Sequence, residues 1–204
     1  MPLILAFDTS AAHCAAALLS GTRLVALRDE AMDKGQAERL IPLMTEVLAA
    51  GGVSWGDLDA LAVGTGPGNF TGVRISVAAA RGLSLSLGIP AIGVTRLEAL
   101  AHGLPRPVRV VEDARRAEVY VQDFDGGSAR LTTLDQVGGD LPLTGSAAHL
   151  VPGGTVLMPV CPLTESMARI AATRLDTTHP RPAPFYLRGA DAAPPADPPP
   201  VLLP

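Results

Sequence analysis

The chain has 204 residues, which is enough for one large domain or two small lobes with a buried core. Hydrophobic residues make up 48% and aromatic residues only 3%, which excludes intrinsic disorder for most of the chain and predicts an aliphatic core. The net charge is −4 and the Lys and Arg residues are scattered, so no basic face for autonomous nucleic-acid binding is expected.

The N-terminal residues and the cysteines indicate the cellular compartment. Residues 1–8 have no basic region before their apolar run, which ends at Asp8, so they predict a first strand and not a signal peptide. Cys14 and Cys161 form no CxxC pair and are expected to be reduced thiols. No apolar run is long enough to span a membrane. We therefore expect a cytoplasmic protein without membrane contacts.

The first hundred residues predict three hairpin-linked strands followed by strand–helix units. The predicted strands are residues 3–8, 13–19, 23–28, 60–64 and 91–94. A helical pattern covers residues 40–48, where Pro42 marks either the start of the helix or a kink, and a long small-residue helix covers residues 70–87. Thr95 and Glu98 form a capping box. This order is typical of a mixed sheet covered by helices.

The second half is less patterned. Residues 105–107 predict a lobe boundary, so we expect an N-terminal lobe at 1–104 and a smaller lobe at 105–189. Strands are predicted at residues 108–111, 118–124 and 129–133, and few elements at 138–154. A closing helix at 164–175, capped by Thr164, is expected to pack back on the first lobe. Residues 190–204 are proline-rich and predict an extended segment.

The segment Asp8-Thr9-Ser10 follows the first predicted strand and precedes the second. A carboxylate and two hydroxyls on such a turn can face a phosphate or its metal ion. The alternative is an Asx-type turn, in which the aspartate accepts hydrogen bonds from nearby backbone N–H groups. These residues alone leave both interpretations open.

The segment GTGPGNFTGVR at residues 64–74 is the most distinctive in the chain. Gly66 and Gly68 allow positive φ and close backbone approach, and Asn69 can cap the following helix, so that N–H groups point at an anion. The segment lacks the Gly-Lys-Ser/Thr of a P-loop and the third glycine of the Rossmann fingerprint. The alternative is a tight strand-to-helix connection that needs glycine for steric reasons only.

Metal and nucleophile motifs are not found. The four histidines, His13, His102, His149 and His179, include no pair at i,i+4 spacing, and each is expected to be a surface or loop residue. There is no HExxH, no Cys/His cluster and no G-x-S-x-G nucleophile elbow. We therefore expect no metal site and no serine-hydrolase site.

Three segments together resemble one family. They are ILAFDTS at residues 4–10, GPGNFTGVR at 66–74 and EDARRAEVY at 112–120; QAERLIPL at 36–43 is a weaker fourth. They resemble the TsaB family, also called YeaZ, of bacterial tRNA threonylcarbamoyladenosine biosynthesis proteins. The likeness covers residues 1–125, and only residues 184–188 match it later.

The resemblance implies an α/β fold with two lobes and mixed sheets, like that of actin, Hsp70 and sugar kinases (ribonuclease H-like), with a reduced second lobe. TsaB proteins are inactive relatives of the catalytic subunit TsaD, whose V-H-H-x-E-G-H segment binds a metal. Here Arg96 and Leu100 stand where imidazoles would be, and neither binds a metal there. The resemblance therefore implies a non-catalytic subunit with no cofactor of its own, and ATP or ADP only at an interface with TsaD.

The implied partners are TsaD, the small ATPase TsaE, tRNA through the complex, and a second copy when the chain is alone. In the family, two helices of the first lobe meet those of the partner in a bundle. The residues expected in this interface are Leu40, Leu43, Met44, Val47, Val73, Arg74, Val77, Ala80, Arg81 and Ser84.

Two other functions compete with this one. An active nucleotide-dependent transferase or kinase of the same fold would use Asp8 and the glycine segment on phosphate, although no second carboxylate is assigned. A peptidase is disfavoured because zinc ligands and a nucleophile motif are missing.

Overall fold

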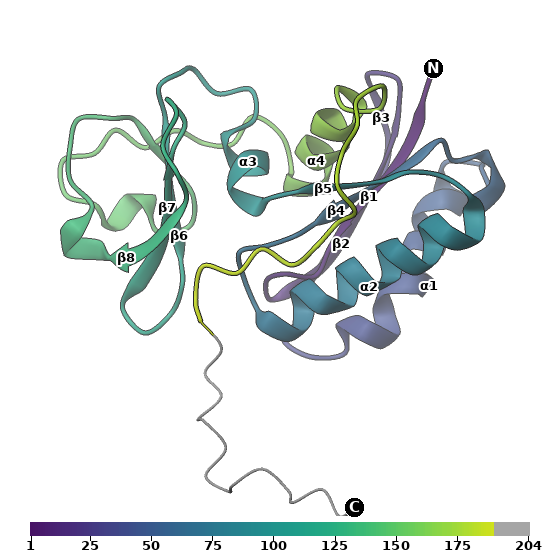
Figure 1. The fold of residues 1–204 in the computed structure, drawn as a ribbon, viewed down its shortest axis with the longest axis horizontal. Helices are drawn as coiled ribbons and strands as arrows, with labels where there is room; N and C mark the ends of the chain where they lie inside the picture. Colours follow the sequence, from purple (N-terminus) through teal and green to yellow (C-terminus); the bar gives the residue numbers. More distant parts are fainter. Residues whose placement is uncertain (190–204) are drawn as a thin grey trace, which may run out of the picture.

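The computed structural model describes residues 1–189 as two lobes, each built on a β-sheet (Figure 1). The first sheet has the strand order β3-β2-β1-β4-β5. Its strands are β1 (Leu3–Asp8), β2 (His13–Ser20), β3 (Arg23–Ala31), β4 (Ala60–Gly64) and β5 (Ala91–Val94). Strands β1, β2 and β3 pair antiparallel, whereas β4 and β5 extend the sheet in parallel with β1. The carboxyl ends of β1 and β4 therefore lie side by side.

Helices cover both faces of this sheet. They are α1 (Gln36–Ala50), α2 (Phe70–Leu87), α3 (Arg96–Ala101) and α4 (Leu163–Ala172). Along β1 the side chains alternate: Leu5 and Phe7 pack with α1 and α2, and Ile4 and Ala6 pack with α4. Figure 1 shows α1 and α2 side by side on one face and α4 on the other. Because both faces are covered, all residues of β4 are buried.

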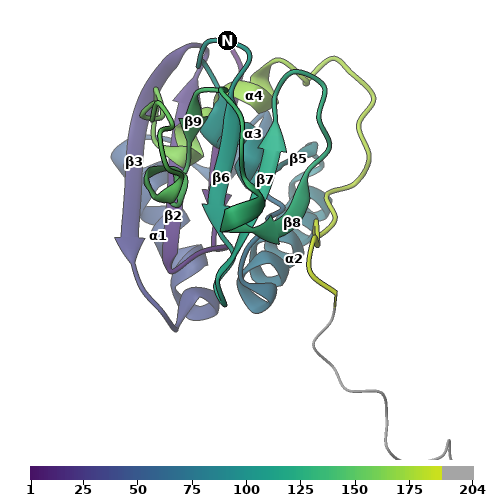
Figure 2. The same ribbon diagram turned by 90° about the vertical axis from the view of Figure 1, so that its left-hand side faces the viewer.

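The second lobe holds a four-stranded sheet of order β8-β7-β6-β9. Its strands are β6 (Arg109–Asp113), β7 (Glu118–Asp123), β8 (Arg130–Thr133) and β9 (Leu143–Thr144). Helix α3 links the lobes, because Leu97 and Leu100 pack with Val110 and Tyr120 of the second sheet. Figure 2 shows the second sheet in front of helices α1 and α2. Short 3₁₀ helices are η1 (Trp55–Asp57), η2 (Leu134–Gln136) and η3 (Ala148–Leu150). The predicted α/β class with mixed sheets is confirmed.

Several predicted elements have different bounds in the structure. Strand β3 continues to Ala31, and α1 begins at Gln36 with Pro42 inside it. Contacts with residues before the helix hold its first turns: the Gln36 side chain donates to the Met32 carbonyl oxygen, and Arg39 forms an ion pair with Glu30 of β3. The missing N–H of Pro42 therefore does not set the start of the helix.

One prediction in the second half is wrong. Thr164 does not cap α4; the helix begins at Leu163 after Pro162, and Thr164 is buried within its first turn. The glycine- and proline-rich region also contains β9, which pairs in parallel with β6 and is too short to show a period of two.

The segment after α4 returns along the first lobe and reaches the second. The Phe185 N–H donates to the Thr65 carbonyl oxygen (2.8 Å), and Arg81 Nε donates to the Pro182 carbonyl oxygen (2.8 Å). Arg188 then donates to the Ala114 carbonyl oxygen (2.9 Å) in the second lobe. This segment therefore connects the two lobes. The predicted extended segment 190–204 lies outside the described residues.

Neither cysteine forms a disulfide. Cys14 is fully buried, and its burial, followed by the charge of Glu30, raises the pKa of its thiol to about 11. No helix within residues 1–189 has the length and apolar character needed to cross a membrane.

Candidate functional site

The two predicted loops meet at the carboxyl ends of β1 and β4. The Asn69 N–H donates to the Ser10 carbonyl oxygen (2.7 Å), and Thr9 Oγ1 donates to the Gly72 carbonyl oxygen (2.7 Å). The Asn69 side chain accepts from the Gly72 N–H (3.0 Å), as expected of an N-cap. Two of the N–H donors expected to face an anion, those of Asn69 and Gly72, are therefore bonded within the protein.

The glycines permit this contact. A Cβ on Gly68 would lie 2.2 Å from the Ser10 carbonyl oxygen, and one on Gly72 would lie 1.9 Å from the Thr9 carbonyl oxygen. Gly66 has a φ of 92°, a value that favours glycine. These glycines therefore have a steric role, because they let the two loops touch.

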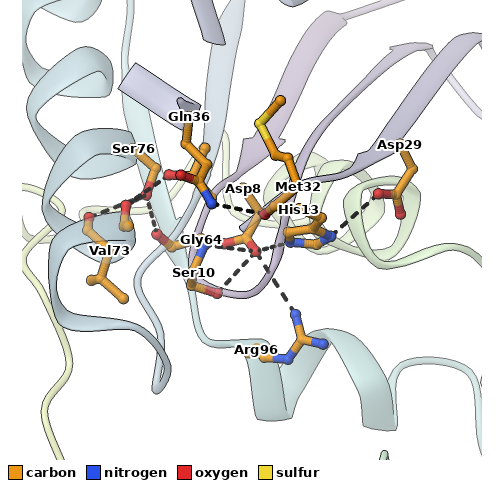
Figure 3. Close-up of polar contacts among 12 residues, drawn as sticks. Asp8, Ser10, His13, Asp29, Met32, Gln36, Gly64, Val73, Ser76 and Arg96 are labelled. Carbon is orange, nitrogen blue, oxygen red and sulfur yellow. Dashed lines mark hydrogen bonds and ion pairs between the residues drawn. The ribbon is translucent and has the colours of Figure 1, made fainter. Parts of the chain in front are cut away.

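The carboxylate of Asp8 lies at the centre of a buried polar cluster (Figure 3). Its Oδ2 accepts hydrogen bonds from the Ser10 hydroxyl (2.9 Å) and from His13 Nε2 (2.7 Å). Its Oδ1 has no hydrogen-bond partner among the described residues and points at Gly64, where a Cβ would lie 1.8 Å away. The closing glycine of β4 therefore makes room for this carboxylate.

Arg96 extends the cluster into the second lobe. Its Nη1 lies 3.8 Å from Asp8 Oδ2, and its Nε donates to Glu112 Oε2 (2.7 Å). Glu112 is buried, and its other oxygen accepts from the Ser146 N–H (2.5 Å). The guanidinium thus lies between a carboxylate of each lobe.

Within residues 1–189, no group of three or more His, Cys, Asp or Glu side chains is placed to hold a metal ion.

Sequence reasoning missed two members of this cluster. His13 was expected to be a surface or loop residue, but it begins β2 and lies between Asp8 and Asp29, whose Oδ1 is 3.3 Å from Nδ1. Glu112 is a second carboxylate at the site, although Arg96 neutralises it. His13 follows the motif at residues 4–10 and Glu112 begins the motif at 112–120, and these positions at strand ends are the signal that could have found them.

These contacts set the ionisation of the cluster. Burial by itself raises the pKa of Asp8, but the hydrogen bond and charge of His13, together with Arg96 and Ser10, hold that pKa below its ordinary value of 3.8. Burial also acts to lower the pKa of Arg96, and the charges of Glu112 and Asp8 raise it above its usual range. The cluster is therefore stable in its charged form.

The low pKa of Asp8 predicts a pH dependence of stability. Because the folded-state pKa lies below the unfolded value, the stabilisation is complete above pH 3.8 and is lost as the pH falls through the folded-state pKa. Asp8→Asn should lower the free energy of unfolding near pH 7, and its difference from the wild type should shrink on acidification. Urea unfolding of both proteins between pH 7 and pH 3 measures the difference in their free energies of unfolding. If that difference does not change with pH, the low pKa of Asp8 is contradicted.

A cavity of about 860 Å³ opens between the lobes above this cluster. We call it the interlobe cavity. It is lined by the β1–β2 turn, the glycine segment, the turn after β6, the segment after β9, and residues 185–189. Arg96 and Glu112 form part of its wall.

The chain matches solved and curated proteins over most of its length. Its structure is similar to that of YeaZ from Pseudomonas aeruginosa, with a TM-score of 0.74 and 29% sequence identity. The match covers 92% of this chain and 100% of that chain. It is 39% identical over 127 residues to TsaB of Escherichia coli, covering 59% of this chain and 54% of that protein. The chain belongs to the TsaB (YeaZ) family.

Other comparisons agree with membership of the TsaB family. Residues 30–154 match the family model described as TsaD, tRNA N6-adenosine threonylcarbamoyltransferase. An uncharacterised protein of Mycobacterium tuberculosis strain H37Rv is 33% identical over 94% of both chains. The ethanolamine utilization protein EutJ from Carboxydothermus hydrogenoformans, at 14% identity and a TM-score of 0.52, shares the fold.

The structure corrects the partner face expected from the TsaB resemblance. Seven of the expected residues are buried against the first sheet and cannot contact another chain: Leu40, Leu43, Met44, Val47, Val73, Val77 and Ala80. The other three contact the chain itself. Arg74 Nε donates to the Tyr186 hydroxyl (3.0 Å), Arg81 to the Pro182 carbonyl oxygen, and Ser84 to the Ile89 carbonyl oxygen (2.6 Å).

The opposite sides of the same two helices face outward. We call this surface the outer helix face; its exposed residues are Ala37, Ile41, Pro42, Thr45 and Ala49 of α1, and Thr71, Ala78, Gly82 and Leu85 of α2. Leu85 is 79% exposed and Ile41 is 44% exposed. These nine side chains are uncharged, but Glu38 and Glu46 of α1 and Arg74 and Arg81 of α2 are exposed as well, so the apolar part of the face lies between charged residues.

Proposed function

We propose that this protein acts in tRNA threonylcarbamoyladenosine biosynthesis as a non-catalytic subunit that binds a TsaD protein through the outer helix face. It would hold TsaD in a competent state together with the ATPase TsaE, and would meet tRNA only through the complex. Curated relatives from Escherichia coli and Haemophilus influenzae carry the biosynthetic name, which supports the pathway.

The exposed aliphatic and small side chains of α1 and α2 are the observation that carries the proposed binding. A large aliphatic side chain such as Leu85 in water forgoes about 1.5–3 kcal/mol of burial. Gly82 and Ala78 allow another helix to approach closely, since a Cβ on Gly82 would meet no atom within 4 Å. This chain matches the TsaD family model, so a TsaD partner would be its homologue. A face that pairs two copies of this chain would therefore also suit pairing with TsaD.

The polar cluster supports a non-catalytic role. Catalysis of phosphoryl or carbamoyl transfer with a metal needs carboxylates or imidazoles with free lone pairs. Here Asp8 Oδ2 is bonded to His13 and Ser10, the unbonded Oδ1 points at Gly64, and Glu112 is bonded to Arg96 and the backbone. Arg96 supplies a fixed positive charge between the two carboxylates, where a cation would otherwise have to bind.

The alternative is an active nucleotide-dependent transferase or kinase of the same fold. Titration calorimetry of the isolated chain with ATP and Mg²⁺ distinguishes the two functions. The proposed subunit should show no binding by itself, with any ATP or ADP held at the interface with TsaD. A tight, Mg²⁺-dependent site in the isolated chain would favour the enzyme.

Ala78→Glu should abolish capture of TsaD, because it places an unpaired carboxylate in the middle of the outer helix face. Leaving a charge unpaired in an interface costs about 3–5 kcal/mol, or more than a hundredfold in affinity. Co-purification with the cognate TsaD and titration calorimetry measure the loss, and circular dichroism checks the fold. The same face would form the homodimer of the isolated chain, so the variant should also be monomeric.

Ser128→Glu is the matched control, since Ser128 is exposed in the β7–β8 turn of the second lobe. It adds the same charge and should leave TsaD binding unchanged. Equal binding by the Ala78 variant and the wild type would overturn the proposed face, and no TsaD binding by the wild type would overturn the function.

A further inference from the structure

A small pocket beside α2 gathers basic side chains at the end of the first lobe where β5 begins. Its volume is about 150 Å³, and its lining residues are Arg81, Ser84, Pro90, Ala91, His179, Arg181 and Pro182. We call it the basic pocket. Two of these seven residues are arginines and one is a histidine, and none is an Asp or Glu. Positive charge in a hollow of this size suits a single oxyanion group and not a whole nucleotide.

The segment after α4 holds two of these basic residues in place. His179 and Arg181 each precede a proline, which restricts both residues to extended backbone conformations. Pro182 is buried, and its carbonyl oxygen accepts a hydrogen bond from Arg81 Nε (2.8 Å). The chain therefore shapes the pocket before any ligand arrives, which reduces the conformational entropy lost on binding.

The arginines of the basic pocket keep free donors. The bond to Pro182 uses only Nε of Arg81, and its terminal nitrogens have no partner among residues 1–189. The Arg181 side chain is exposed and has no hydrogen-bond or ion-pair partner in the described part of the chain. His179 Nδ1 is buried there and also lacks a partner. Buried polar groups are normally satisfied, so this pocket has unused capacity to bind a ligand.

The basic pocket borders the outer helix face. Arg81 stands three residues after Ala78 and four residues before Leu85, and residues at these spacings are neighbours on a helix surface. Both neighbours belong to the outer helix face. A partner that covers this face therefore brings its own surface to the edge of the pocket. Protein interfaces surround their apolar centre with a polar rim, where complementary charges orient the partner.

The charge distribution favours an acidic side chain over a nucleic-acid backbone. A phosphate backbone carries charges at short, regular intervals, and proteins that bind it present several cations along its path. Here Arg174, which donates to the Gly93 carbonyl oxygen of β5, is paired with Glu98 (2.6 Å) and adds no free charge. The net charge of −4 also opposes a long polyanion. Two guanidinium groups at one pocket instead suit one carboxylate, which accepts several hydrogen bonds.

We propose that the basic pocket binds an acidic side chain of TsaD when that protein covers the outer helix face. This inference rests on the proposed function and adds the chemistry that orients the partner. The carboxylate accepts hydrogen bonds from Arg81 and Arg181, while the aliphatic and small residues of the face supply the apolar contact. The pocket therefore sets the register of the complex, and the outer helix face supplies most of its affinity.

Arg181→Glu should weaken TsaD binding about tenfold at low ionic strength, because it replaces an attractive charge with a repulsive one. Titration calorimetry of the two purified proteins measures the loss. The wild-type affinity should also fall more steeply with added NaCl than that of the variant. Arg23→Glu is the matched control, since Arg23 is exposed in β3 at the opposite edge of the first sheet. It makes the same change of charge and should bind TsaD like the wild type.

A crosslink identifies the group in the pocket directly. Lys34 is the only lysine of the chain, so Lys34→Arg/Arg181→Lys has one side-chain amine, at the basic pocket. A carbodiimide joins an amine to a carboxylate in contact with it and takes up the water released, forming a urea. Mass spectrometry of the treated complex should show an amide bond between position 181 and an Asp or Glu of TsaD. Lys34→Arg/Arg23→Lys is the control and should show no such bond.

The outcomes separate this inference from the proposed function. Equal TsaD binding by Arg181→Glu and the wild type, or no crosslink from position 181, would overturn the pocket while Ala78→Glu still tests the face. An equal loss in Arg23→Glu would assign the effect to net charge and overturn the pocket as well. Normal TsaD binding by Arg181→Glu with loss of tRNA from the complex would make the pocket an RNA phosphate site. No TsaD binding by the wild type would overturn both proposals together.

Discussion

Gly72→Ala should destabilise the protein by about 3–4 kcal/mol, whereas Gly82→Ala in the same helix should stabilise it by up to about 1 kcal/mol. Both glycines lie within α2. A Cβ on Gly72 would lie 1.9 Å from the Thr9 carbonyl oxygen, which is backbone and cannot move like a flexible side chain. The helix would have to shift, and the bond from Thr9 Oγ1 to the Gly72 carbonyl oxygen would be lost with it.

Gly82 has the opposite surroundings. Nothing lies within 4 Å of its added Cβ, so the substitution only removes the conformational freedom of glycine in a helix interior. Urea unfolding followed by circular dichroism gives both free energies. Equal effects of the two substitutions would contradict the close contact between the β1–β2 turn and α2. A fully folded Gly72→Ala chain with wild-type stability would do the same.

Arg96→Met should destabilise the protein by about 3–5 kcal/mol, which is the second large effect expected. The side chain of Arg96 is only 18% exposed. Without its guanidinium, the buried Glu112 has no counter-charge, and His13 is the only remaining basic group beside Asp8. Methionine keeps much of the volume, so the change reports mainly on charge. Because Arg96 bridges carboxylates of the two lobes, the second lobe should also lose protection in amide hydrogen exchange.

A second substitution separates charge from packing. Glu112→Gln in the Arg96→Met background should recover part of the lost stability, since it removes the uncompensated charge. Arg23→Met, at an exposed position in β3, is the control and should change the free energy of unfolding by less than about 0.5 kcal/mol. No recovery in the double variant would mean that the Arg96 side chain acts through packing and not as a counter-ion.

Within the first lobe, most elements follow from local pattern. Strands β1, β4 and β5 and helix α2 have the predicted bounds, because each is a short apolar run or a small-residue helix between clear turn or capping residues. The glycine segment and the Asp8 turn are also recognisable from their residue types and their positions after predicted strands. Their meeting follows from the parallel pairing of β1 and β4.

The second lobe and the outer surfaces were harder to predict. Helix α2 has small or apolar residues on most of its sides, with Arg74 and Arg81 as its only charged ones, so its periodicity does not show which side faces the sheet, and the expected place of Ala80 in the partner interface is wrong. His13 and Glu112 belong to different motif regions of the chain, and only the folding of β1, β2 and β6 brings them to Asp8 and Arg96.

The amino-acid sequence by itself determined the family, the α/β class and the loops of the site, because these depend on short motifs and on local periodicity. Only the tertiary structure decided which helix faces are free and that Arg96 joins the carboxylates of the two lobes. The physical reason is that burial and ion pairing depend on contacts between residues distant in the chain, and a single sequence does not record those contacts.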